Sequence, residues 1–116
     1  MLTIEQRTIE PDIQVLQLGG RVTLGESAQE LEVAVERLMA AQPKKVVFDL
    51  SGLKFVDSTG IRTIVMCASR LKGTGGTVHL AGAQGIVQEA LHLLRIADMV
   101  PIFESVNEAV AAFFSK

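Results

Sequence analysis

The chain has 116 residues, 48% of them apolar and 21% charged, which favours a globular protein and excludes an intrinsically disordered one. Its length suits one domain covering residues 1–116. The formal net charge is -2, the basic residues form no run, and neither Trp nor Tyr occurs, so the sequence gives no basis for binding nucleic acid or an anionic membrane.

The single cysteine, Cys67, cannot form a disulfide within the chain, and its place in a periodic apolar stretch predicts a small buried side chain. The first residues, MLTIEQRTIEP, carry charges from position 5 and do not have the pattern of a signal peptide. No uncharged apolar run is long enough to span a bilayer, so we expect a cytoplasmic protein without direct membrane insertion.

Two strands are predicted at the start of the chain. Residues 2–10 (LTIEQRTIE) alternate in part, residues 11–12 (PD) mark a turn, and residues 13–22 (IQVLQLGGRV) form the second strand of a hairpin. The glycine pair at 19–20 ends this strand or introduces a bulge. The apolar residues of the second strand should lie on two opposite faces: Ile13 and Val15 on one, Leu16 and Leu18 on the other.

A helical period follows in SAQELEVAVERLMAA, where Ser27 and Glu30 fit a capping box that starts the helix near Ser27. The run VVFDL at 46–50 predicts a buried central strand, after which Ser51 and Gly52 open a loop. The residues on the apolar face of this first helix are Ala28, Leu31, Val35, Leu38 and Met39.

The rest of the chain alternates between helices and strands. Pro101 cannot donate to a ladder, which predicts that its strand lies at an edge of the sheet, and Ser105 with Glu108 forms a second capping box. The expected elements are a helix over 61–71 capped by Gly73, a strand over 77–82, a helix over 86–97, a strand over 100–103 and a helix over 106–114. The apolar face of the helix over 86–97 contains Ile86, Val87, Ala90, Leu91 and Leu94.

The predicted order of elements is β-β-α-β-α-β-α-β-α, an α/β fold on the border of α+β. We expect a mixed, mostly parallel sheet of about four to five strands with four helices. After the hairpin, the parallel strands should be joined by right-handed crossovers.

The usual catalytic and metal-binding patterns are absent from the sequence. Residues 56–60 read Val-Asp-Ser-Thr-Gly and lack the Gly-x-Ser-x-Gly pattern of a nucleophile elbow. His79 and His92 lie on a predicted strand and a predicted helix, where surface or structural roles are favoured, and they give no metal-ligand spacing with Cys67. The glycines of KGTGGTVHLAGAQG match neither a dinucleotide-binding motif nor a P-loop. We therefore expect no catalytic residue, no metal and no cofactor.

Three polar residues, Asp57, Ser58 and Thr59, stand together where an apolar run ends and a helical run begins. One interpretation is structural: a polar residue at a helix start accepts a hydrogen bond from a free amide, which is worth about 1 kcal/mol. Capping explains only one of the three, and Gly60 is a poor helix former that suits a place where something approaches the backbone closely. The other interpretation is that a hydroxyl is presented for modification.

Phosphorylation suits this position because free amides and the positive end of the helix dipole favour an anion. A phosphate on Ser58 would add about 1.5 to 2 negative charges beside Asp57 and oppose the docking of a partner while leaving the fold intact. Thr59 lies one residue away and remains an alternative acceptor.

The strand VVFDLS, the loop GLKFV and the helix start DSTGI together resemble the signature of STAS domains, a family named for sulfate transporters and anti-sigma factor antagonists. The segments LQLGGRV, TVHLAG and PIFESVNEAV extend the resemblance over nearly the whole chain, which is similar to the free-standing bacterial antagonists. The resemblance implies that a partner that is both a serine kinase and an anti-sigma factor phosphorylates Ser58, and that a serine phosphatase resets the cycle. ATP and Mg²⁺ would belong to the kinase, so this chain would be a substrate and a ligand rather than an enzyme.

The resemblance also assigns roles to the neighbours of Ser58. Asp57 would help to position the hydroxyl, and the residues of the docking surface would be Thr59, Gly60, Ile61 and Arg62. Thr23 stands where many relatives carry an acidic residue after the second strand, which leaves open the contacts that this chain makes with its partner.

Three functions stay open from the sequence. The favoured one is a binding module switched by phosphorylation, with a sigma factor or another signalling protein as its output. The second is a STAS subunit bound constitutively to a signalling or membrane transport complex, in which the region of Ser58 is only an interface. The third is a small enzyme with Ser58 as its nucleophile, for which the spacing of the residues indicates no base.

Overall fold

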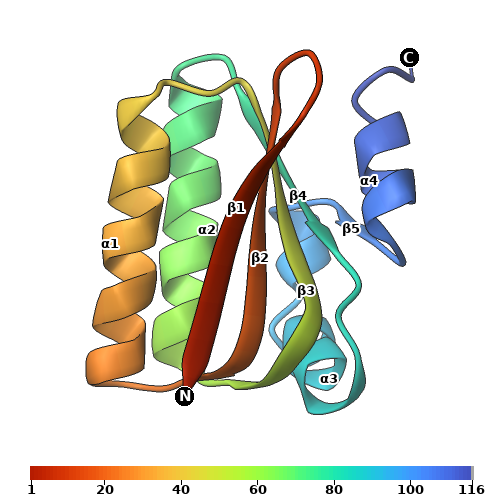
Figure 1. The fold of residues 1–116 in the computed structure, drawn as a ribbon. Coiled ribbons are helices and arrows are strands. Elements are labelled where there is room, and N and C mark those ends of the chain that lie inside the picture. The colour runs from red at the N-terminus through yellow and green to blue at the C-terminus, as the bar shows by residue number, and fades with distance from the viewer. Residues whose placement is uncertain (116) are drawn as a thin grey trace.

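The computed structural model describes residues 1–115, which form a five-stranded sheet in the order β1-β2-β3-β4-β5 (Figure 1). β1 runs antiparallel to β2, and the other neighbouring strands are parallel. The predicted order of the elements and the mixed, mostly parallel sheet are therefore confirmed. The strands are β1 (Leu2–Ile9), β2 (Ile13–Val22), β3 (Lys45–Val56), β4 (Thr77–Ala81) and β5 (Ile102–Phe103).

Four α-helices follow the strands within the described residues. α1 and α2 lie side by side on one side of the sheet, and α4 lies on the other side (Figure 1). A 3-10 helix, η1 (Ile96–Asp98), precedes β5 and is not indicated by the sequence pattern. The α-helices are α1 (Glu26–Ala40), α2 (Ser58–Gly73), α3 (Gly85–Leu93) and α4 (Val106–Ala111).

Two apolar clusters occupy the two faces of the sheet, and β2 contributes to both. Leu16 and Leu18 belong to the larger cluster, which also contains residues of α1, α2 and α3. Ile13 and Val15 belong to the smaller cluster, which contains residues of α4. Because successive side chains of a strand point to opposite faces, this division confirms the alternation predicted for the strand.

β3 continues to Val56, so the prediction of a loop from Ser51 is wrong. The strand continues through Gly52, where β2 lies close: a Cβ added to Gly52 would lie 3.4 Å from the Cα of Gly19. The register between β2 and β3 shifts around the glycine pair at 19–20, and β2 continues beyond it. Of the two alternatives predicted for this pair, the bulge is therefore confirmed and the end of the strand is wrong. The longer β3 carries the chain directly to the start of α2.

The two capping predictions have different outcomes. Gly25 is the N-cap of α1, and the Oγ of Ser27 instead accepts from the N of Thr23 at 2.9 Å and donates to the carbonyl oxygen of Thr23 at 3.1 Å. The capping box at Ser27 is therefore wrong, because this residue lies in the first turn of the helix. At α4 the Oγ of Ser105 accepts from the N of Glu108 at 3.1 Å, which confirms Ser105 as the cap.

Two helix ends also differ from the predictions. Gly73 is the last residue of α2, and Gly75, with a φ of 87°, takes the left-handed conformation expected at a helix end. α3 ends before Arg95, whose φ of 55° turns the chain away from the longer predicted helix. Ile86 and Leu94, predicted on the buried face of that helix, are 55% and 51% exposed.

The cysteine and one histidine have structural positions. Cys67 is buried, as predicted, and burial raises the pKa of its thiol to about 11. His79 is buried on β4, where its Nδ1 lies 2.8 Å from the carbonyl oxygen of Ala109 and its ring stacks on Phe113 with centroids 4.0 Å apart. Burial lowers the pKa of His79 by more than the hydrogen bond to Ala109 raises it. His92 is exposed.

Candidate functional site

Asp57 joins β3 to α2 and is the N-cap of the helix. Its backbone is extended, and its Oδ1 accepts hydrogen bonds from the N of Thr59 at 3.0 Å and the N of Gly60 at 3.2 Å. These bonds satisfy amides that a helix start leaves without a partner inside the helix. The structural interpretation of the polar triplet therefore applies to Asp57.

The second carboxylate oxygen of Asp57 holds a different segment. Its Oδ2 accepts from the N of Leu24 at 2.8 Å, and the N of Asp57 donates to the carbonyl oxygen of Val22 at 3.0 Å. Burial of the carboxylate raises its pKa, but the amide donors of Leu24, Gly60 and Thr59 together outweigh burial and leave the pKa below the ordinary 3.8. The charged Asp57 thus fastens the loop after β2 to the start of α2.

Ser58 is the first residue of α2 and is exposed. Within residues 1–115 the side-chain hydrogen bonds of this turn come from Asp57 and Thr63, and the hydroxyl of Ser58 makes none. Thr59, the alternative acceptor of a phosphate, is only half exposed. An enzyme approaching from solvent therefore reaches Ser58 more easily than Thr59.

The start of α2 has fewer free amides than the sequence predicts. The N of Thr59 and the N of Gly60 donate to the carboxylate of Asp57, so the expectation that these amides are free for an anion is wrong. Arg62 offers a positive charge instead. It is exposed and follows Ser58 by four residues, a spacing that places two side chains on the same face of a helix.

Gly60 and Ile61 lie behind the exposed surface. A Cβ added to Gly60 would lie 2.6 Å from the Cγ2 of Val56 and 2.8 Å from the Cγ1 of Val22. The close approach predicted for this glycine is therefore present, but the approaching atoms belong to the core. Ile61 is 5% exposed. Neither residue offers a side chain to a partner in this conformation.

The loop after β2 brings Thr23 and Leu24 to the same site. Thr23 is half-buried, whereas the side chain of Leu24 is 79% exposed although its backbone is held by Asp57. Sequence reasoning missed Leu24, and the signal that could have found it is an apolar residue placed directly before Gly25 in a loop. Because its backbone is already fixed, an apolar contact through this leucine would cost a partner complex little ordering of the loop.

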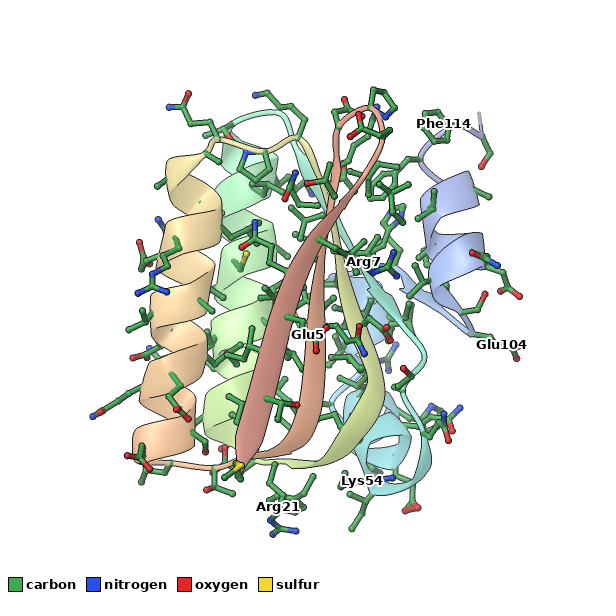
Figure 2. The ribbon with its side chains drawn as sticks, viewed as in Figure 1. Glu5, Arg7, Arg21, Lys54, Glu104 and Phe114 are labelled. Carbon is green, nitrogen blue, oxygen red and sulfur yellow. The ribbon has the colours of Figure 1, made fainter. Side chains whose placement is uncertain are left out.

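Basic side chains lie on the strands that end at this site. Arg21 of β2 places its guanidinium carbon 4.7 Å from the centroid of the Phe55 ring, and Lys54 of β3 is exposed. Figure 2 shows Arg21 and Lys54 projecting at the end of the molecule where α2 begins. Arg21 and Lys54 thus add positive charge to the end of the molecule at which α2 begins.

Other parts of the molecule do not gather the predicted site residues. Within residues 1–115, no group of His, Cys, Asp and Glu side chains is arranged to hold a metal ion, and no helix has both the length and the apolar composition to cross a membrane. A groove lined by α3, η1 and β5 contains His92 and Arg95 but no residue predicted at the site. The predicted residues come together at the start of α2.

The α/β fold and the capped helix start with its exposed serine define the protein class. The chain belongs to the STAS family, whose model, described as STAS domain, matches residues 6–109. One relative is the anti-sigma-F factor antagonist RsfB of Mycobacterium tuberculosis, which is 24% identical over 98 residues that cover 84% of this chain and 79% of RsfB. The resemblance found in the motif around Ser58 is thereby confirmed.

Solved structures share this fold. An anti-sigma factor antagonist from Mycobacterium paratuberculosis has a TM-score of 0.87 at 22% identity, covering 97% of this chain and 93% of that chain. The Bacillus cell fate determinant SpoIIAA in its phosphorylated form has a TM-score of 0.73 at 12% identity, covering 96% of this chain and 99% of that chain. At these identities the likeness shows the fold.

Proposed function

We propose that this chain is an anti-sigma factor antagonist, a regulatory module that binds a partner protein through the start of α2 and is switched off by phosphorylation of Ser58. The observation that carries the proposal is the exposed Ser58 in a helix turn held by Asp57. RsfB and the paratuberculosis protein, both named antagonists, support the class. The phosphorylated form of SpoIIAA supports phosphorylation on this fold.

The docking surface proposed here consists of exposed side chains around a fixed backbone. Ser58 and Arg62 are presented by α2, and Leu24 by the loop that Asp57 fastens to it. Thr23 and Thr59 are half-buried at its margin, while Gly60 and Ile61 shape the surface from behind. Asp57 is a positioning residue, because its carboxylate is occupied by backbone amides.

A phosphate on Ser58 acts on binding rather than on folding. It adds about 1.5 to 2 negative charges to a surface that contains the apolar Leu24 and the carboxylate of Asp57, so a partner would have to desolvate that charge on docking. Within the chain, Arg62 lies four residues further along the helix and compensates part of the charge. The modified chain therefore keeps its fold and loses affinity for its partner.

The partners follow from this cycle. A serine kinase that is also an anti-sigma factor brings ATP and Mg²⁺ and transfers the γ-phosphoryl group to the Oγ of Ser58, whose proton is lost, with ADP as the other product. A serine phosphatase hydrolyses the phosphoserine and restores the binding form. In this scheme the chain is substrate and ligand, not an enzyme, and acts in the cytoplasm.

Phosphorylation with a kinase of this type tests the proposal. Incubation with ATP and Mg²⁺ should add the mass of one phosphoryl group to the wild type and to Thr59→Val, and none to Ser58→Ala. Ser69→Ala is the matched control, because Ser69 is an exposed serine of the same helix that lies far from its N-terminus. Incorporation into Ser58→Ala, or none into the wild type with every kinase of this type from its organism, would contradict the switch. Binding that persists without phosphate turnover would favour the constitutive subunit.

A further inference from the structure

The outer edge of β1 has no neighbouring strand within residues 1–115. β1 (Leu2–Ile9) is the first strand of the sheet, and in this part of the chain it pairs only with β2. Figure 2 looks onto this edge, and no helix crosses in front of the strand. An edge strand of this length presents unpaired backbone groups that can pair with another strand.

The hydrogen-bonding phase of β1 follows from its pairing with β2. The N of Arg21 donates to the carbonyl oxygen of Met1 at 3.1 Å, which marks these opposed residues as a hydrogen-bonded pair. Because the register is continuous, the odd-numbered residues of β1 bond to β2. The N–H and C=O groups of the even-numbered residues therefore point outward: Leu2, Ile4, Gln6 and Thr8.

Two opposite charges stand on one face of this edge. Glu5 and Arg7 lie on the side of the sheet away from α1, since Leu2 and Ile4 belong to the larger cluster and Ile9 packs on the smaller one. Both side chains are exposed (Figure 2), and within residues 1–115 neither forms an ion pair. They are two positions apart in the sequence, the spacing at which strand side chains share a face.

We propose that a second copy of this chain pairs with this edge, β1 against β1 in antiparallel orientation, with Gln6 on the two-fold axis and Glu5 opposite Arg7 of the partner subunit. The outward groups belong to even-numbered residues, so a regular ladder must pair even with even. The next possible register on one side places Glu5 opposite the partner's Glu5, and the next on the other side places Arg7 opposite the partner's Arg7. Charge therefore disfavours both neighbouring registers.

The pairing joins two sheets into one. About six new main-chain hydrogen bonds form, from Ile4, Gln6 and Thr8 of each copy. The Glu5–Arg7 pairs fall at non-hydrogen-bonded positions, where opposed side chains come closest, and the two-fold axis creates each pair twice. The contact is centred on Gln6 in the middle of β1, whereas Ser58 is presented by α2.

Charge reversal tests the pairing. Sedimentation velocity over a series of protein concentrations should show a dimer for the wild type. Glu5→Arg and Arg7→Glu, both at exposed positions, should each weaken the dimer by about tenfold to a hundredfold, because like charges then oppose one another twice. The double variant Glu5→Arg with Arg7→Glu restores opposite charges and should regain the dimer.

A disulfide tests the register. In the proposed dimer the Cα atoms of Gln6 and the partner's Gln6 lie about 5.5 Å apart, within disulfide range, so Gln6→Cys should cross-link on mild oxidation. Glu5→Cys is the matched control, because its Cα lies about 8 Å from the same atom of the partner and should not cross-link. Cys67 is buried in both variants and should not interfere.

A wild type that remains a monomer throughout the series would overturn the proposal. So would a dimer that survives both single reversals, or a double variant that stays a monomer while its circular dichroism is unchanged. Equal cross-linking of Gln6→Cys and Glu5→Cys would exclude the proposed register. An edge that binds only an extended peptide of another protein would give a monomeric wild type, and so would count against the pairing.

Discussion

The two faces of the sheet are packed very differently. On one face α1, α2 and α3 cover a large cluster of fully buried aliphatic side chains and Phe48. On the other face α4, a helix of six residues, covers a small cluster in which several members are half-buried and His79 is enclosed. The proposed site lies at the start of a helix on the well-packed face. A surface charge can therefore change there without loss of the fold, whereas the α4 face should respond to pH.

Truncating one aromatic ring on each face gives the largest expected contrast. Phe48→Ala removes a fully buried ring and should lower the free energy of unfolding by about 3–5 kcal/mol. Phe113 is half-buried against His79, so Phe113→Ala should cost about half as much. Urea denaturation measures both. If Phe48→Ala does not fold, Phe48→Leu against Phe113→Leu makes the same comparison. Equal losses would remove the distinction between the faces.

The second-largest effect on stability is expected from the hydrogen bonds of Asp57. Asp57→Ala loses the helix cap and the bond to Leu24, and it should lower the free energy of unfolding by about 1–2 kcal/mol. Asp57→Asn keeps an oxygen for the cap but has no second acceptor for the amide of Leu24, so its loss should be smaller. Faster amide exchange at Leu24 in both variants, measured by NMR, would show that the loop is released. Unchanged exchange at Leu24 in both variants would show that Asp57 does not hold this loop.

The carboxylate of Asp57 also has a pH signature. Its pKa is lower in the folded chain than the ordinary 3.8, so its contribution to stability is full above about pH 3.8 and is lost as the pH falls through the folded pKa. Asp57→Asn should lack this acid-dependent loss. The alanine variant should behave as the asparagine variant does in this window.

As the pH falls, the contribution of the α4 face to stability should be lost before that of the start of α2. Burial lowers the pKa of His79 from 6.5, so the unfolded chain takes up a proton below that pH while the folded chain does not. Stability is therefore full above about pH 6.5 and falls as the pH drops toward the folded pKa, by at most about 1.4 kcal/mol per pH unit. Urea titrations at pH 7.5 and pH 5.5 measure the difference, which should shrink in His79→Asn. His92→Asn, at an exposed site, should behave as the wild type does.

The smallest effect on stability is expected at Ser58 itself. Ser58→Asp places a negative charge at an exposed helix start, where the dipole favours it, and should change the free energy of unfolding by less than about 0.5 kcal/mol. Ser69→Asp, at an exposed position of the same helix far from its N-terminus, lacks this favourable interaction and serves as control. A large loss of stability in Ser58→Asp alone would mean that modification acts by unfolding the site.

The sequence predicts the parts of this molecule that depend on periodicity. The alternation in β2 identifies both faces, and the motif around Ser58 identifies the junction between β3 and α2. The loop predicted at Ser51 is wrong because a Ser-Gly pair is usually a turn signal, whereas here β3 continues and its Gly52 lies close to Gly19 of β2. Such an approach joins residues far apart in the chain.

The finer parts of the site depend on the same kind of distant contact. The bond between Asp57 and the amide of Leu24 joins two loops 33 residues apart, and no local pattern indicates it. The sequence predicts a close approach at Gly60, but only the structure shows that the approaching side chains are Val22 and Val56. Thr23 and Ser58 share a surface for the same reason: the parallel strands β2 and β3 end side by side.

The most direct test of the proposed switch compares the affinity of one partner for two forms of the chain. Isothermal titration should show the anti-sigma kinase binding the unphosphorylated chain at least about tenfold more tightly than the chain phosphorylated at Ser58, while both forms melt at nearly the same temperature. Equal affinity for the two forms would contradict the account, and so would a phosphorylated chain that has lost its fold.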